Sequence, residues 1–264
     1  MLYLALAITS FRRTMTYRAA TLAGLVTNFF FGLVRVFVFV ALFESARQAR
    51  VAGYSLQNAV TYVVLGQFMI APLLIFGSYD ISITIRTGDI AGDLARPMDF
   101  YFFWLARDLG RAAFSLLGRS VPLLIFYPLF FELTWPSSPA RWAAFALSIF
   151  LAVLVSFSWR FLVNCAAFWT VDARGVARMA FLGSFLFTGL VLPLAFFPDG
   201  LVPWLRLLPF AAYINTPAEV FMGVVPDNGL AVALAQQLAW AVALGVAARA
   251  VFAAGVRHLT VQGG

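Results

Sequence analysis

The sequence predicts an all-α integral membrane protein, and two observations carry that prediction. Hydrophobic residues make up 63% of the 264 residues and charged residues only 11%, whereas about a quarter of a soluble domain is charged. The apolar residues also gather in runs of about 20, the length that a helix needs to cross a bilayer. A soluble core could not bury so much apolar surface, so we expect lipid around most of the chain.

Residues 1–18 predict an amphipathic helix that lies along the inner membrane surface. The apolar residues of one face recur at spacings of 4, 3 and 4: Leu4, Ile8, Phe11 and Met15. The polar residues fall opposite them: Thr9, Arg12, Arg13 and Thr16. Leu2 and Leu6 break the pattern, so an irregular start of the first span is the alternative interpretation.

Six segments are long and apolar enough to span a bilayer, and together they make residues 1–264 a single transmembrane domain. They cover residues 19–43, 59–79, 112–133, 142–169, 176–197 and 229–255. If the N-terminus is inside, the inner segments hold 11 arginines and the outer loops, including Arg47, hold 4. This excess places both termini in the cytoplasm. The net charge of +7 has the same explanation, so we expect no nucleic-acid partner.

The predicted cytoplasmic loop, residues 80–111, is unusually polar. Its part from 86 to 111 holds 8 of the 29 charged residues of the chain. Asp89 can cap a short helix over 90–96, and Pro97 ends it because the residue before a proline is pushed out of the helical region. A second amphipathic helix starts at Met98 and leads into the third span.

The short helix has two distinct faces. Asp93 and Arg96 share one face and Ile90 and Leu94 share the other, because residues three and four apart are neighbours on a helix. A polar helix held at the cytoplasmic surface by two spans suits the docking of a soluble partner. A solvated loop that only fixes the topology is the alternative.

Residues 198–228, between the last two predicted spans, are apolar but broken by proline. The prolines are Pro198, Pro203, Pro209, Pro217 and Pro226. No uninterrupted span fits them, and broken backbone at membrane depth needs protein around it. We therefore expect two short re-entrant helices that enter the outer leaflet from outside, and two further full spans are the alternative.

Several polar residues lie within the predicted spans. Arg35, Arg119 and Arg160 could extend to lipid phosphates, or they could face a cavity and meet an anionic group. The amide side chains could line a cavity or form interhelical hydrogen bonds: Gln67, Asn164, Gln236 and Gln237. The acids near spans fall at their ends: Glu44, Asp80, Glu132 and Asp172. None of them lies near the midplane of a span, which argues against a self-contained carrier driven by protons or sodium.

The residue types that are absent exclude further chemistry. All 18 basic residues are arginine, so the chain has neither a lysine-containing phosphate loop nor a Schiff-base lysine. A single histidine, His258, and a single cysteine, Cys165, argue against a zinc site. The sequence contains no nucleophile–base pair of the kind that would indicate a membrane-embedded enzyme. It also lacks the E-A-A loop signature that would indicate an ABC importer permease.

Three stretches resemble permease subunits of the ABC type-2 family, in particular short bacterial six-span permeases. They are "IRTGDIAGDLARPMDFYFFWLARDLGR", "LPLAFFPDGLVPWLRLLPFAAYINTPAEVFMG" and the terminal "LTVQGG". The resemblance implies that the inner loop docks on a separate ATPase as a coupling helix. The residues implied are Arg86, Thr87, Gly88, Asp89, Asp93, Arg96, Pro97 and Asp99.

The resemblance also implies partners and a location. Two copies of an ATPase subunit would bind ATP and Mg²⁺, with no cofactor in this chain. A second permease, identical or related, would complete the pathway in the bacterial inner membrane, surrounded by lipids. The expected activity is export of a small amphiphilic or lipid-like molecule, while a secondary transporter or an ABC importer permease is the alternative.

Overall fold

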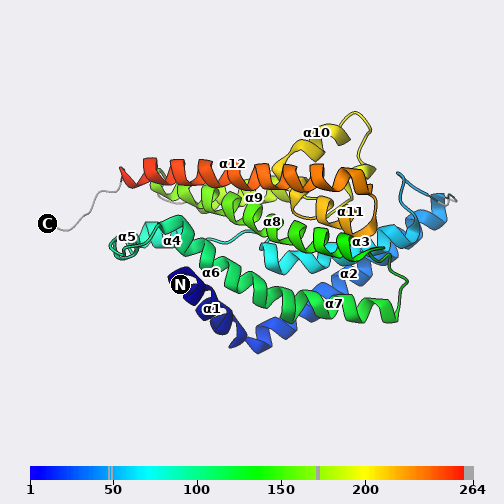
Figure 1. The fold of residues 1–264 in the computed structure, drawn as a ribbon, viewed down its shortest axis with the longest axis horizontal. Helices are drawn as coiled ribbons and strands as arrows, with labels where there is room; N and C mark the ends of the chain where they lie inside the picture. The colour runs from blue at the N-terminus through cyan, green and yellow to red at the C-terminus, as the bar shows by residue number, and fades with distance from the viewer. Residues whose placement is uncertain (47, 49, 171–172, 259–264) are drawn as a thin grey trace.

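The computed structural model describes residues 1–46, 48, 50–170 and 173–258 as α-helices joined by turns (Figure 1). Among these residues, extended backbone pairs only in one isolated bridge, between Val51 and Tyr54. The all-α prediction is therefore confirmed for the described part of the chain. Arg47, Asp172 and the terminal "LTVQGG" lie outside the described residues.

Five helical stretches among the described residues are long and apolar enough to cross a membrane. They are α2 (Arg18–Ala46), α3 (Leu56–Leu73), the run Phe100–Leu129, α8 (Pro139–Asn164) continued to Phe168, and Asp227–Val256, which contains α12 (Leu230–Val256). The prediction of a multi-span helical protein is thus confirmed, but the count of six spans is not.

The predicted span over 176–197 is not one helix. Helix α9 covers only Arg174–Leu186, and the chain then turns before a short 3-10 helix at Leu194–Phe196. Gly189 adopts a φ of +85°, and the Tyr62 hydroxyl lies where a Cβ would be. The sequence is apolar enough to span, but this tertiary contact favours a turn that only glycine tolerates.

The third long helix begins earlier than its apolar run predicts. It comprises α6 (Phe100–Ser115), a π-helical turn (Leu116–Ser120), α7 (Val121–Phe126) and a 3-10 turn (Tyr127–Leu129). Asp99 caps it, because its Oδ1 accepts from the backbone N–H of Phe102 at 3.1 Å. The span start expected at 112 is therefore wrong, whereas the amphipathic helix expected from Met98 is present, begins at Phe100 and is continuous with the span. Asp108 lies inside this long helix.

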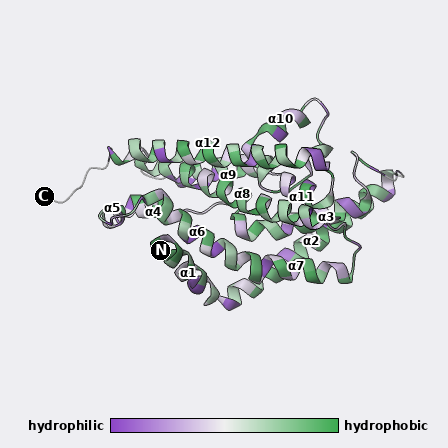
Figure 2. Ribbon diagram, viewed as in Figure 1, coloured by the Kyte–Doolittle hydropathy of each residue, from purple (hydrophilic) through white to green (hydrophobic). Residues whose placement is uncertain are grey.

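Helix α3 lies at the centre and is buried over most of its length. Ser55 caps its start by accepting from Asn58 N at 3.1 Å, and Leu74 ends it with a φ of +47°. Helix α12 packs along α8, and α1 packs along α6 (Figure 1). The outer faces of α2 and α12 expose large apolar side chains such as Phe30, Phe37 and Val242. The ribbons of both helices are mainly green in Figure 2, the colour of hydrophobic residues. Such faces suit lipid rather than water.

Helix α1 covers Leu2–Met15, so the predicted N-terminal helix is confirmed. Leu4, Ile8 and Met15 are exposed as expected for a membrane-facing stripe. Its other side touches α6: a Cβ on Gly110 would overlap the Ala7 carbonyl, and Ser10 Oγ donates to the Arg107 carbonyl at 2.6 Å. Its place at the membrane surface stays a prediction.

The proline-broken segment forms short helices, as predicted. They are α10 (Val202–Leu207), a 3-10 turn (Pro209–Ala212) and α11 (Asn215–Met222). Their entry into the outer leaflet stays a prediction. At the opposite end of the molecule, α4 (Asp80–Thr87) and α5 (Ile90–Leu94) lie near the end of α12 and the start of α1 (Figure 1).

Candidate coupling and translocation site

Helices α4 and α5 form a projection at one end of the molecule (Figure 1). Arg86, Thr87, Gly88 and Asp89 are exposed at its bend, and Ile90 is buried beneath them. Gly88 makes the bend possible, because its φ is +81° as it ends α4. The bend thus presents polar groups outward while one apolar anchor holds it to the body.

The structure corrects the expected role of Asp89. Its side chain makes no capping hydrogen bond to α5. Instead, its Oδ2 accepts from the Thr87 hydroxyl at 2.7 Å and braces the bend. Helix α5 also ends at Leu94, before the predicted limit, and Leu94 is exposed while Ile90 is buried. A helix this short cannot bury a whole apolar face, so only its first residue reaches the body.

The second half of the projection is held by charges. Arg96 forms an ion pair with Asp93 at 3.3 Å, which agrees with the predicted shared face. Its guanidinium also lies 5.3 Å from the centre of the Phe103 ring. Beyond the exposed Pro97, Asp99 caps α6 and accepts from Arg249 of α12 at 2.9 Å. The predicted coupling residues are therefore gathered in one projection, and α12 is tied to its base.

Asn164 ties the start of α4 to the end of α8. Its Oδ1 accepts from the backbone N–H of Ser82 at 3.0 Å. Its Nδ2 donates to the carbonyl oxygens of Ser78 and Arg160, at 2.8 and 2.7 Å. The residue is 1% exposed. Asn164 thus makes hydrogen bonds between elements, the second of its two predicted roles, and connects the projection to the helix bundle.

A buried ionic cluster lies just above this connection. Asp108 of α6 accepts from Arg160 of α8 at 2.7 Å and from Arg111 Nε at 3.0 Å. Arg111 also donates to the carbonyl oxygens of Ala71 and Pro72 at the end of α3, at 2.9 and 2.7 Å. Those carbonyls lie in the last turn of α3, at the negative end of the helix dipole. The cluster therefore joins three long helices through one buried carboxylate.

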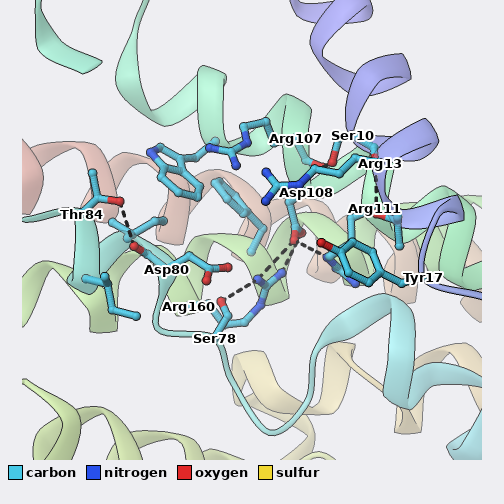
Figure 3. A pocket seen from close by; sticks show the side chains of 15 residues that line it. Ser10, Arg13, Tyr17, Ser78, Asp80, Thr84, Arg107, Asp108, Arg111 and Arg160 are labelled. Atoms are coloured by element: carbon cyan, nitrogen blue, oxygen red, sulfur yellow. Dashed lines mark hydrogen bonds and ion pairs between the residues drawn. The ribbon is translucent and has the colours of Figure 1, made fainter. Parts of the chain in front are cut away.

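The cluster forms one wall of a basic cavity of ≈ 480 Å³ (Figure 3). Arg13 and Tyr17 approach from the N-terminal segment, and Asp80 and Thr84 from α4. Figure 3 shows Arg160 and Arg111 converging on Asp108. Arg160 lines this cavity, and Asp108 is the anionic group with which it pairs.

A second, apolar cavity of ≈ 430 Å³ contains two other predicted residues, Arg35 and Gln67. The remaining predicted residues lie in neither cavity. Arg119 packs against α2, where a Cβ on Gly24 would overlap its guanidinium. Ser148 Oγ donates to Gln237 Oε1 at 2.8 Å, and Gln236 Nε2 donates to the Arg206 carbonyl at 2.6 Å. Both glutamines thus make interhelical or helix–turn bonds.

A buried acidic residue that the sequence reasoning missed lies at the opposite end of the molecule. Glu219 of α11 is 3% exposed. Its Oε1 accepts from Arg206 at 2.7 Å and from the Tyr54 hydroxyl at 3.1 Å. Burial raises the pKa of Glu219, while Arg206 and the hydrogen bonds oppose that shift. The proline-broken segment is therefore linked to the turn before α3.

The second link of this segment is Arg141, at the start of α8. Its guanidinium pairs with Asp227 and donates to the Val225 carbonyl at 2.9 Å. Asn215 Oδ1 adds a contact to α3 by accepting from the Tyr62 hydroxyl at 3.2 Å. These bonds hold the short helices across the ends of α3 and α8.

Asp108 was missed because the apolar run that marks the third span starts after it. A signal was present: Asp108 and Arg111 are three apart, and Arg160 is a charge inside an otherwise apolar run. A charge within a span usually pairs with another. Asp108 therefore has to be added to the acids associated with spans, because it lies within a candidate span.

The comparison with protein families agrees with this arrangement. The model of the family described as ABC-2 family transporter protein matches residues 29–263, which is most of the chain. No curated protein matches the sequence. The match includes α4, α5, the ionic cluster, the proline-broken segment and the lining of both cavities from residue 29 onward. The chain therefore belongs to the ABC-2 family of transporter membrane proteins.

Proposed function

We propose that this chain is the permease subunit of an ATP-driven exporter for a small amphiphilic or lipid-like molecule. The ATPase is a separate subunit in two copies that carries ATP and Mg²⁺. A second permease, identical or related, completes the pathway. The assembly lies in a bacterial inner membrane with both termini in the cytoplasm. The exposed α4–α5 projection, fixed to α8 by Asn164, is the observation that carries this proposal.

The contacts of the projection support a coupling role. A solvated loop that only fixed topology would need no buried bonds to the bundle. Here, the segment 78–82 is held by Asn164 at both ends, and Arg160 donates to Ser78 Oγ at 3.4 Å. A displacement of the projection by an ATPase would therefore move the end of α8 and strain the ion pair between Asp108 and Arg160.

The charged groups of the projection suit a protein partner. Arg86 and Asp89 are exposed at the bend, and Arg96 is exposed just beyond the end of α5. Complementary charges on an ATPase would give orientation and specificity to the docking. At the other end, the bonds of Glu219 and Arg141 hold the proline-broken segment over the bundle, where it would close the pathway until the helices move.

The experiment exchanges the two charges of α5, Asp93→Arg with Arg96→Asp, which keeps the net charge. Losing a desolvated charge pair costs about 2–5 kcal/mol, and roughly 1.4 kcal/mol changes binding tenfold. We expect normal membrane insertion, loss of ATPase co-purification by more than about tenfold, and loss of export.

The matched control is Glu132→Gln, which changes an exposed charge at the opposite end and should leave both assays unchanged. Wild-type co-purification and export in the exchanged variant would remove the coupling role from these residues. ATP hydrolysis by the purified chain alone would contradict the assignment of hydrolysis to a separate subunit.

A further inference from the structure

The apolar cavity opens between α2, α3 and α9. Its walls are mainly large hydrophobic side chains: Phe31, Ile70, Phe76, Phe185, Leu190 and Val191. Phe76 and Phe31 are more than half exposed, so the cavity opens at the surface of the helix bundle. Such walls can accept an acyl chain or another apolar group. Two polar groups in the cavity, however, lack partners that an apolar ligand cannot supply.

The first of these groups is Arg35. Its position is ~25 Å from the start of α2, counting 1.5 Å per residue, and so lies well inside the helix. Its Nη2 donates to the Val191 carbonyl at 2.8 Å. Among the described residues, no carboxylate approaches its guanidinium within the 4.0 Å of an ion pair. A charge at this depth is costly without an anion, so the cavity lacks a counter-charge.

The second group is Gln67 of α3, which is 3% exposed. Its Oε1 is buried and has no hydrogen-bond partner. The side chain cannot swing away freely, because it is packed against α2: a Cβ on Gly32 would come within 2.9 Å of Gln67 Cγ. The cavity therefore holds an acceptor that lacks a donor, which is an unfavourable state for a buried group.

The missing anion at Arg35 and the missing donor at Gln67 can both be supplied by one kind of molecule. Asn28, Gly32 and Arg35 lie at spacings of 4 and 3, so they share the face of α2 that meets Gln67. A ligand must supply an anion to Arg35 and an N–H or O–H to Gln67 Oε1. A purely apolar occupant would satisfy neither.

We propose that this cavity binds an anionic amphiphile that carries a hydrogen-bond donor close to its anionic group. The anion pairs with Arg35, the donor meets Gln67 Oε1, and the apolar body lies along the phenylalanines. This rests on the proposed function, because it names the chemical class of the exported molecule. A second permease covering the same opening is the competing occupant, and the experiment separates the two.

The probe is N-dodecanoylglycine with a fluorescent nitrobenzoxadiazole group on its tail, whose carboxylate lies beside an amide N–H. Two analogues change one group each: the methyl ester removes the charge, and the sarcosine analogue removes the N–H. Each is titrated into the purified full-length chain in phosphatidylcholine nanodiscs, without ATPase or ATP. We expect saturable binding of the acid and affinities at least about tenfold lower for both analogues.

The variants assign these preferences to residues. Arg35→Gln should abolish the preference for the acid over the ester, and Arg35→Lys should retain it. Arg119→Gln is the matched control, since it removes an arginine from another candidate span that does not line this cavity. Gln67→Leu should abolish only the difference between the glycine and sarcosine probes. Because it fills the site with an apolar group, this variant tests the proposal even if Arg35→Gln fails to fold.

Phosphatidylglycerol in the nanodiscs identifies the source of the ligand: displacement of the probe would make an anionic membrane lipid itself a ligand, and no displacement would indicate a free amphiphile. The proposal would be overturned if no probe bound saturably and a second copy of the chain covered the cavity. Equal acid preference in Arg35→Gln and Arg119→Gln would also overturn it. Failure of the wild-type chain to co-purify with an ATPase would contradict the proposed function instead. The two results are independent, because the binding assay contains no ATPase.

Discussion

Asp108 and Arg160 meet in the interior through a 2.7 Å ion pair, with 8% and 5% of their side chains exposed. The two residues belong to different long helices, α6 and α8, and both line the basic cavity (Figure 3). Charges removed from water are costly unless they are paired and hydrogen-bonded. Arg111 and two carbonyls at the end of α3 complete the pairing, so this contact fixes the relative position of three helices.

Removing the carboxylate charge at 108 should destabilise the protein strongly. Breaking a buried pair leaves an uncompensated charge and costs about 3–5 kcal/mol, whereas an exposed pair contributes about 0–1 kcal/mol. We therefore expect Asp108→Asn to lower the thermal unfolding midpoint clearly, measured by tryptophan fluorescence in detergent. Asp93→Asn breaks the partly exposed pair with Arg96 and is the control. Equal midpoints for the two variants would contradict the structural role of the cluster.

Asn164→Leu should separate docking from coupling. The change removes three hydrogen bonds between α8 and the segment 78–82 or within α8, but leaves every exposed residue of α4 and α5 in place. We expect the ATPase to co-purify normally, while substrate-stimulated hydrolysis falls by about tenfold, the effect of losing one or two such bonds. Gln237→Leu, which removes an equally buried amide far from α4, should keep the stimulation. Loss of co-purification with Asn164→Leu would show that the residue shapes the docking surface instead.

Glu219 should make stability depend on pH in a defined direction. Burial raises its pKa in the folded chain, so the folded state holds the proton more tightly than the unfolded state does. Stability from this group is therefore full below the unfolded pKa of about 4.3 and is lost as pH rises through the raised folded value. A glutamine side chain cannot ionise, so Glu219→Gln should gain stability over the wild type as pH rises from about 4 to about 8.

The measurement is the difference in thermal midpoint between the two proteins at each pH. Glu132→Gln is the control, because it makes the same substitution at an exposed acid. A difference for Glu219→Gln that shrinks with rising pH would mean that Arg206 outweighs burial.

Topology gives the last prediction. Arginines lie near both ends of the chain, and the projection lies at the same end of the molecule as the end of α12 (Figure 1). Alkaline phosphatase folds only outside the cytoplasm, so a fusion at the C-terminus should be inactive. The same enzyme inserted at Gly53, in the turn between α2 and α3, should be active. An active C-terminal fusion would reverse the assigned orientation.

The helices that could be predicted are those whose signals are local. The spacing of apolar residues indicated α1, and long apolar runs indicated the five candidate spans. The prolines indicated the short helices α10 and α11, since no long helix can continue through them. The bounds were less certain where a polar helical turn precedes an apolar run, as at Asp99 and Phe100, because an apolar run marks the lipid-facing part of a helix rather than its ends.

Composition and local patterns thus suffice to show that the chain is helical and built for a membrane, and which loop carries the charges. They do not show which polar groups meet, and that was decided by packing. Asp108 and Arg160 are 52 residues apart, and Tyr54 and Glu219 are 165 apart. Such pairs depend on how each helix is rotated about its axis, and close contacts such as that of Gly110 in α6 with the Ala7 carbonyl limit that rotation. The same packing leaves Gln67 without a donor and ends α9 at Leu186, because a side chain's partners are fixed by neighbouring helices and not by its own segment.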